Sequence, residues 1–315
     1  MLLNSLWIIV GVVLVIWGAD RLTAGSVAVA ERLHVPQIVI GLTIVALGTS
    51  MPELCVSVVS ALRGTPDLAV GNVVGSNVFN ALLIVGVAAL VAPMTISPQT
   101  VRKDIPWTLV ASVILLMMCQ NDWVITRIDG AVLFILAVVF MCLTLRGAQT
   151  AKQPDEPEDQ PSVTDKKPMA AWAAALWIVV GLAALIGGSN VFVGGATEVA
   201  KALHVSDAVI GLTIVAGGTS LPELATSVVA ARKGNSGIAI GNVLGSNVLN
   251  ILFILGLTGI ISPMHIEGIT NFDLYIMLIS TIMLWFFSYT KYTIERWEGA
   301  VLVLVYCGYI WYLIP

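Results

Sequence analysis

Long apolar runs alternate with short polar segments along the whole chain. A helix needs about 20 apolar residues to cross the hydrocarbon core of a bilayer. The runs therefore predict an all-α polytopic membrane protein with ten transmembrane helices. The predicted spans are 3–30, 37–62, 68–91, 104–120, 128–146, 171–199, 207–231, 238–261, 272–290 and 297–314.

One polar segment is much longer than the other breaks between spans. Residues 147–170 are rich in proline and acidic side chains, a composition typical of a mobile linker. This linker divides the chain into a first five-helix repeat, 1–146, and a second five-helix repeat, 171–315. No other polar segment is long enough to hold a soluble domain.

The second half repeats two motifs of the first half at a constant offset of 170 residues. "GLTIVALGTS" at 41–50 returns as "GLTIVAGGTS", and "GNVVGSNVFN" at 71–80 returns as "GNVLGSNVLN". Between 41–80 and 211–250, 26 of 40 positions are identical. Because each half has an odd number of spans, the second half enters from the opposite face and the repeats are inverted. Inverted repeats with interrupted helices are typical of secondary transporters, which bind substrate near the midplane between the repeats.

The composition agrees with a membrane protein and sets its orientation. Hydrophobic residues make up 58% of the chain and charged residues only 11%, against about 25% charged residues in a soluble domain. Lysine and arginine in short loops mark the cytoplasmic side. With the N-terminus outside, eleven basic residues lie in inner loops and three in outer loops. We therefore expect a multi-pass protein of the cell membrane (inner or plasma membrane), with both termini outside and the linker cytoplasmic.

Two carboxylates interrupt the apolar pattern at equivalent positions. Glu53 and Glu223 lie three or four residues past the middle of spans two and seven, or about 5 Å along a helix. The motifs "SMPE" and "SLPE" fit a capping box, in which Ser50 or Ser220 caps a helix and the glutamate bonds back. A proline at the first helical position fits the same interpretation. Each span is therefore predicted to consist of two half-helices.

Capping does not explain why a helix restarts in the middle of a membrane. Unwound backbone is tolerated there only where it lines a cavity or is buried in protein, so we expect a cation site. Oxygen ligands suit hard cations, and Ca²⁺ takes 6–8 of them, whereas the lack of any group of histidine and cysteine residues in these motifs argues against zinc, copper or iron. The candidate ligands are Glu53, Glu223, Thr49, Ser50, Thr219, Ser220, Ser76, Asn80, Ser246 and Asn250, with the free carbonyls of Ala46 and Ala216.

Four further asparagines in the second motif admit two interpretations. They either bond neighbouring helices or take a direct part in binding; the four are Asn72, Asn77, Asn242 and Asn247. The glycines of this motif favour close helix packing of the GxxxG type.

The motifs "GTSMPEL", "GTSLPEL" and the two "GNV.GSN" runs resemble the α-repeats of the sodium/calcium exchanger family, within the calcium/cation antiporter superfamily. The resemblance covers the whole chain and is nearest to the small prokaryotic members. It implies electrogenic exchange of several Na⁺ for one Ca²⁺ without ATP, with both ions as transported substrates and no cofactor. It also implies that Glu53 and Glu223 are the central Ca²⁺ ligands and share Na⁺ coordination. Thr49, Ser50, Thr219 and Ser220, with the carbonyls of Ala46 and Ala216, would form flanking Na⁺ sites, and the long first and sixth spans would slide to alternate access.

Other functions compete with this prediction. In a H⁺/Ca²⁺ antiporter the two glutamates would exchange protons. A K⁺-dependent Na⁺/Ca²⁺ antiporter is a second rival, since some relatives carry aspartate where this chain has Asn250. A cation channel is the alternative from another class. We expect no enzymatic activity, since no nucleophile–base pair appears, and no nucleic-acid partner, since no basic tract appears. The expected partners are Ca²⁺, Na⁺ and the lipid bilayer, without an obligatory protein partner.

Overall fold

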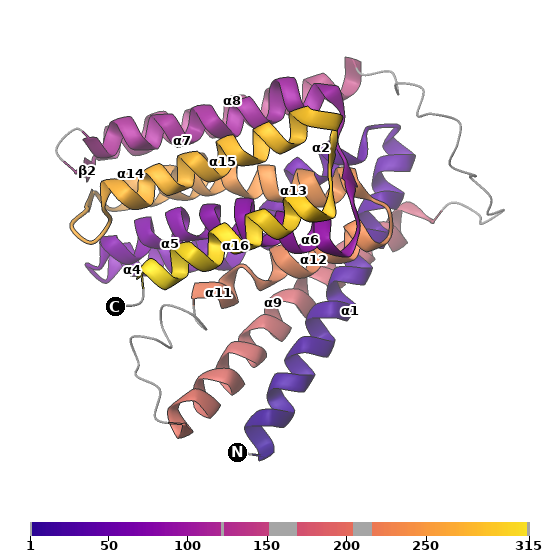
Figure 1. Ribbon diagram of the computed structural model, residues 1–315, viewed down its shortest axis with the longest axis horizontal. Helices are drawn as coiled ribbons and strands as arrows, with labels where there is room; N and C mark the ends of the chain where they lie inside the picture. The colour runs from indigo at the N-terminus through magenta and orange to yellow at the C-terminus, as the bar shows by residue number, and fades with distance from the viewer. Residues whose placement is uncertain (1, 121–122, 151–168, 204–215, 314–315) are drawn as a thin grey trace.

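The computed structural model describes residues 2–120, 123–150, 169–203 and 216–313. Most of the predicted linker and the beginning of the predicted span 207–231 lie outside the described residues. Within them the chain is almost entirely helical (Figure 1).

The helices follow the predicted order, with short π-helical turns, labelled η, inside several of them. The first repeat holds α1 (Leu2–Leu33), α2 (Gln37–Ile40), η1 (Gly41–Val45), α3 (Ala46–Thr49), α4 (Met51–Leu62), α5 (Pro66–Val78), η2 (Phe79–Ile84), α6 (Val85–Val91), η3 (Thr100–Asp104), α7 (Ile105–Gln120) and α8 (Arg127–Thr150). The second repeat holds α9 (Ala171–Ala202), α11 (Ala216–Thr219), α12 (Leu221–Arg232), α13 (Ser236–Leu249), η5 (Asn250–Leu255), α14 (Gly256–Ile261), α15 (Asn271–Lys291) and α16 (Arg296–Leu313).

The predicted count of ten crossings is not confirmed by helix length and hydropathy. Six helices in the described part of the chain are long and apolar enough to cross a bilayer, and the bent pair 37–49 and 51–62 makes a seventh. One reason is that α7 has only 16 residues, fewer than the about 20 that a span needs. Another is that the seventh predicted span is described only from Ala216 onward.

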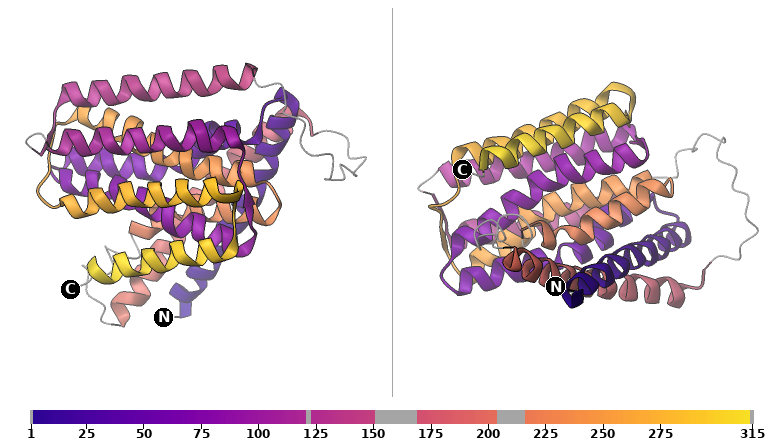
Figure 2. Two further views of the ribbon diagram at one scale, coloured as in Figure 1. Left: turned by 45° about the horizontal axis from the view of Figure 1, so that its top comes forward. Right: turned by 60° about the horizontal axis from the view of Figure 1, so that its bottom comes forward.

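Two continuous helices, α5–η2–α6 and α13–η5–α14, form the centre of the bundle. In their most apolar stretches 72% and 78% of the residues are buried, against 39% or less in α1, α8, α9 and α15. In sequence they are the two "GNV.GSN" spans, so one of the two repeated motifs lies in the core. Around them α8 packs on α14, and α16 packs on α6 (Figure 2).

Short strands join loops of the two repeats at both ends of the bundle. β1 (Met94–Thr95) pairs antiparallel with β4 (Thr293–Ile294), and β2 (Val124–Ile125) pairs antiparallel with β3 (Met264–His265). Each two-stranded sheet therefore links a loop of the first repeat to a loop of the second. These backbone bonds fix the repeats to one another outside the apolar layer.

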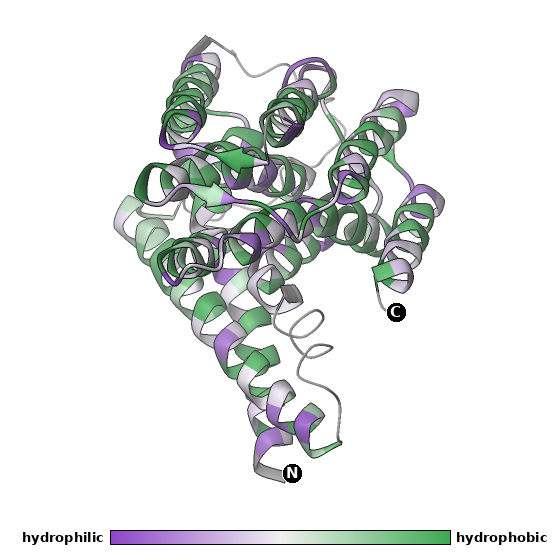
Figure 3. Ribbon diagram, turned by 90° about the vertical axis from the view of Figure 1, so that its left-hand side faces the viewer, coloured by the Kyte–Doolittle hydropathy of each residue, from purple (hydrophilic) through white to green (hydrophobic). Residues whose placement is uncertain are grey.

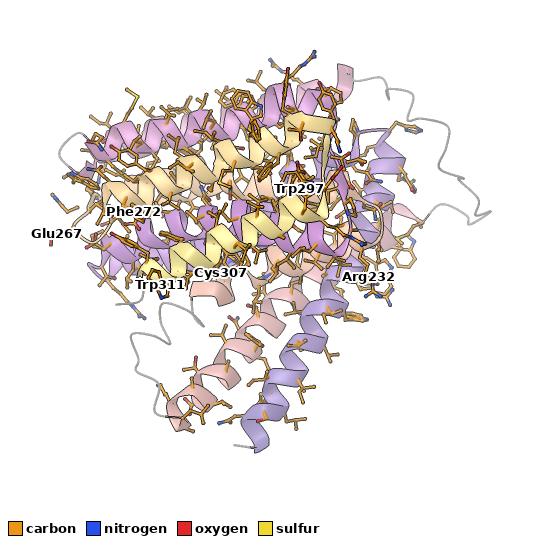
Figure 4. All side chains as sticks on the ribbon, in the orientation of Figure 1. Arg232, Glu267, Phe272, Trp297, Cys307 and Trp311 are labelled. Atoms are coloured by element: carbon orange, nitrogen blue, oxygen red, sulfur yellow. The ribbon has the colours of Figure 1, made fainter. Side chains whose placement is uncertain are left out.

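The loops alternate between the two ends of the bundle as the span order predicts. Arg232 and Trp297 lie at one end, and Glu267, Phe272 and Trp311 lie at the other (Figure 4). Large hydrophobic side chains such as Ile135 in α8 and Ile279 in α15 are exposed between these ends, and hydrophobic residues make up much of the helical ribbon (Figure 3). The arrangement agrees with helices that cross a membrane from one end to the other.

The longest helices, α1 and α9, run antiparallel and share the most extensive contact in the fold (Figure 1). Their contact is made by small residues, so that a Cβ on a glycine of one helix would lie within 2.9 Å of the backbone of the other. Small residues let membrane helices approach to backbone contact where lipid supplies no hydrophobic drive. The facing pairs, spaced seven residues apart, are Gly11 with Gly188, Gly18 with Gly181, Gly25 with Ala174 and Gly195 with Asn4.

Alanine at Gly181 should destabilise the protein, whereas alanine at Gly187 should not. A Cβ on Gly181 would lie 2.6 Å from the backbone nitrogen of Leu22, while Gly187 is exposed and has no described neighbour within 4 Å. Overpacking of this kind costs about 1–3 kcal/mol. Thermal unfolding in detergent should show a lower midpoint for Gly181→Ala only; equal effects of the two variants would contradict the backbone contact.

Candidate functional site

The predicted break is present in both repeats, and a proline follows each break. In the first repeat α3 ends at Thr49, α4 begins at Met51, and the helix bends by 45°. In the second, α11 ends at Thr219 and α12 begins at Leu221. A proline has no N–H to bond the carbonyl four residues earlier. For Pro222 that carbonyl belongs to Gly218, and the Ser189 hydroxyl of α9 donates to it at 2.5 Å.

The capping-box prediction is wrong, although the breaks are real. Neither Ser50 nor Ser220 makes a side-chain bond to its own helix. The Ser50 hydroxyl instead donates to Oε1 of Glu223 at 3.0 Å, and the Ser220 hydroxyl donates to Oε1 of Glu53 at 2.9 Å. A hydrogen bond to a carboxylate is stronger than one to a neutral group. Each serine therefore bonds the glutamate of the other repeat and does not cap its own helix.

Two asparagines hold the backbone that carries the carboxylates. The Asn72 amide donates to the Glu53 carbonyl at 3.2 Å and to the Ser57 hydroxyl at 3.1 Å. In the second repeat the Asn242 amide donates to the Glu223 carbonyl at 3.2 Å and to a serine hydroxyl, that of Ser227, at 2.9 Å. The interhelical interpretation therefore holds for Asn72 and Asn242. The serines Ser57 and Ser227 were missed by the sequence argument, although both lie four residues after the glutamate.

The other pair of asparagines bonds across the boundary between the repeats. The Asn77 amide donates to the Asn247 carbonyl at 3.1 Å, and the Asn247 amide donates to the Asn77 carbonyl at 3.3 Å. These bonds join the two central helices at their middle. For this pair, too, the structure shows interhelical hydrogen bonding.

The two carboxylates are buried together without a basic partner. Glu53 is 1% exposed and Glu223 is 0% exposed, and the two groups lie close enough to repel one another. Neither forms an ion pair with any described lysine or arginine. In the described ranges no group of three or more histidine, cysteine and acidic side chains forms a cluster of the kind that binds transition metals. The site is therefore built from oxygen atoms and carries two formal negative charges.

Several oxygen atoms of this region are buried and have no hydrogen-bond partner among the residues that the structure describes. A buried polar atom without a partner costs free energy, so a concentration of them indicates a ligand-binding site. Each of these oxygen atoms can donate a lone pair to a cation. Both asparagines among them lie in π-helical turns, Asn80 in η2 and Asn250 in η5. The atoms without a described partner are Oε2 of Glu53, Oε2 of Glu223, Oδ1 of Asn80, Oδ1 of Asn250 and Oγ of Ser246.

The remaining candidate ligands differ in their hydrogen-bond partners and in their distance from the carboxylates. The Ser76 hydroxyl is bonded to the Ser220 hydroxyl at 3.2 Å and so joins the group around Glu53. The Thr49 hydroxyl donates to Oδ1 of Asn242 at 3.0 Å, and Thr219 also approaches Glu53. The Ala46 carbonyl was expected to be free, but it accepts the N–H of Ser50 at 3.0 Å. Its counterpart, Ala216, is the first residue of α11.

The site can be compared with known proteins. The family described as sodium/calcium exchanger protein matches residues 3–146 and 173–314. The chain is 38% identical to the putative antiporter CaxA of Alkalimonas amylolytica, with 98% of both chains covered. It is 32% identical to the sodium/calcium exchanger MaX1 of Methanosarcina acetivorans, covering 98% of this chain and 97% of that one.

A solved structure supports the same assignment. The sodium-calcium exchanger NCX_Mj, soaked with Na⁺ and Sr²⁺, superposes with a TM-score of 0.85 and 29% sequence identity, and 98% of each chain is covered. The agreement thus extends over both repeats. The chain belongs to the sodium/calcium exchanger family of membrane antiporters.

Proposed function

We propose that this protein exchanges Na⁺ for Ca²⁺ across the cell membrane, and that both ions bind between the two repeats. The observation that carries the proposal is the set of buried acceptor oxygens that have no partner in the described part of the chain. They belong to the two glutamates and to neighbouring elements, since η5 packs on α4 and η2 packs on α12. Acceptors supplied by carboxylates and amides match the preference of Ca²⁺ for six to eight oxygen ligands. The two negative charges would be neutralised by one Ca²⁺ or by two Na⁺, which is the basis for competition between the ions.

The ligands fall into a central and a flanking group in this proposal. The carboxylates of Glu53 and Glu223 bind Ca²⁺ at the centre, with amide oxygens from Asn80 and Asn250. The Ser50 and Ser220 hydroxyls already touch the carboxylates and can turn their oxygens to a bound ion. The flanking Na⁺ sites draw on the following groups: Thr49, Ser50, Thr219, Ser220, Ser76, Ser246 and the carbonyls of Ala46 and Ala216.

Alternating access is the motion that this fold favours. The α1–α9 pair contacts the broken helices through side chains, since a Cβ on Gly48 would lie 2.6 Å from the Leu182 side chain and one on Gly218 would collide with Val193. Helices that contact through side chains slide past one another more easily than α1 and α9, which contact through their backbones. In this structure Asp20 of α1 forms an ion pair with Lys233 at 2.5 Å, and movement of α1 along the bundle would break it.

We keep the domain organisation that the sequence predicts as part of this proposal. Two inverted five-helix repeats, 1–146 and 171–315, build one site, and the 147–170 segment joins them on the cytoplasmic side. The distribution of basic loop residues supports both termini outside.

The rival functions differ in what the carboxylates carry. In a H⁺/Ca²⁺ antiporter they would bind protons, and the hydroxyls around them would have no ion to coordinate. A channel usually places its selectivity elements on an axis between subunits, whereas here one chain supplies both halves of a closed, buried site. Potassium dependence is disfavoured because both repeats end the second motif in a neutral asparagine.

Calcium should stabilise the purified protein through the two glutamates. A ligand present at 100 times its dissociation constant stabilises the folded state by about 2.7 kcal/mol, so the thermal midpoint should rise with Ca²⁺ concentration. In Glu53→Gln this rise should disappear. Glu298→Gln is the matched control, because Glu298 is also buried but caps the start of α16, where it accepts the N–H of Glu295 at 2.7 Å. A Ca²⁺-induced rise that survives in Glu53→Gln would remove the glutamate from the site.

An outward Na⁺ gradient should drive ⁴⁵Ca²⁺ into proteoliposomes, and Glu223→Gln should abolish this uptake because one of the two site charges is lost. Uptake should saturate with Ca²⁺, as expected of a carrier. Glu298→Gln again serves as the control for a folded, active protein. Uptake driven equally well by a pH gradient without Na⁺ would favour the proton-coupled rival, and flux that does not saturate would favour a channel.

A further inference from the structure

Four buried asparagines form a closed hydrogen-bond network across the boundary between the repeats. Each is 1% exposed, and each repeat contributes two, from the end of its "GNV.GSN" motif. Besides the two bonds to backbone carbonyls, the Asn80 amide donates to Oδ1 of Asn247 at 3.0 Å, and the Asn250 amide donates to Oδ1 of Asn77 at 3.1 Å. The network comprises Asn77, Asn80, Asn247 and Asn250.

The direction of every bond in this network is fixed by chemistry. A backbone carbonyl can only accept, so the Nδ2 end of Asn77 must face the carbonyl of Asn247. The Oδ1 end of Asn77 must then point the other way, where it accepts from Nδ2 of Asn250. The same reasoning with the repeats exchanged orients Asn247 and, through it, Asn80.

This network also fixes the direction in which the side-chain oxygens of Asn80 and Asn250 point. With their nitrogens engaged, Asn80 and Asn250 turn their Oδ1 atoms away from the network, and both atoms are buried without a hydrogen-bond partner among the described residues. An amide that was free to flip would present N–H groups half of the time, and these repel a cation. A fixed amide always presents its oxygen.

We propose that Asn77 and Asn247 are positioning residues for the cation site. Asn77 fixes the amide of Asn250, Asn247 fixes the amide of Asn80, and neither positioning residue needs to touch the ion. The inference rests on the proposed function, since the oriented oxygens are taken to face a bound Ca²⁺ or Na⁺. Each repeat thus orients a ligand that belongs to the other repeat.

Double-mutant cycles on Ca²⁺ affinity test this arrangement. Leucine has nearly the shape of asparagine and removes both polar ends. Loss of a group that orients a metal ligand typically lowers affinity about 10- to 100-fold, so Asn77→Leu should weaken Ca²⁺ binding by that factor. Once Asn250 is already leucine, the further change Asn77→Leu should have little effect. The pairs Asn77/Asn250 and Asn247/Asn80 should therefore be strongly non-additive.

The within-repeat pairs provide the matched comparison. Asn77/Asn80 and Asn247/Asn250 are close in sequence but do not orient one another, so their effects should be nearer to additive. Thr258→Val controls for the loss of a buried polar group outside the network and should leave Ca²⁺ affinity unchanged. Equal coupling in all four pairs, or unchanged affinity in Asn77→Leu, would overturn the proposal.

A second variant keeps the test valid if leucine prevents folding. Asn77→Ala removes the amide without adding bulk, so Asn250 loses the acceptor that fixes its orientation. It should lower Ca²⁺ affinity as Asn77→Leu does, with the folded state checked by gel filtration; unchanged affinity would count against the proposal. Absence of Ca²⁺ binding by the unmodified protein would refute the proposed function instead, so the two failures are distinguishable.

Discussion

Two negative charges buried in a bilayer need a positive charge beside them, and no described basic side chain provides one. This constraint organises the centre of the molecule. The serines that could cap their own helices bond the opposite carboxylates, and asparagines hold the backbone behind each acid. In the proposed function, a bound Na⁺ or Ca²⁺ would supply this positive charge, and the two uncompensated carboxylates are the reason that the protein would bind it.

The inverted repeat makes most contacts of the site appear twice, with the roles of the halves exchanged. Ser50 bonds Glu223 as Ser220 bonds Glu53. The symmetry is not complete, however. The Gly218 carbonyl of the second break accepts the Ser189 hydroxyl, whereas the equivalent position in α1 is Ala19, which has no hydroxyl to donate. The two halves of the site are therefore similar in their ligands and different in how α1 and α9 hold them.

Much of this fold is readable from the sequence because its signals are local or repeated. Hydropathy predicts the order of the helices, the repeat predicts the inverted halves, and the proline after each "GTS" predicts the break. The partners of Ser50 and Ser220 were not predicted, because a capping box is a local pattern and the competing carboxylate arrives from 170 or so residues away. The asparagine network was left open for the same reason: its motif indicates a role, and only the fold shows which helix it faces. The number of membrane crossings is the least certain part of the sequence prediction. Spans are counted by their length, and α7 is shorter than the length that a span requires.

The seven-residue spacing of small residues in α1 and α9 has a mechanical consequence. Where side chains separate two helices, an applied force is partly absorbed by their rotamers. Here backbone meets backbone at four successive levels, so no compressible layer lies between the helices, and the pair behaves as a stiff two-stranded rod. Movement at either end of the pair is then transmitted along its whole length of about 48 Å. In the proposed exchange cycle, opening the site to one side of the membrane and closing it to the other would therefore be a single event.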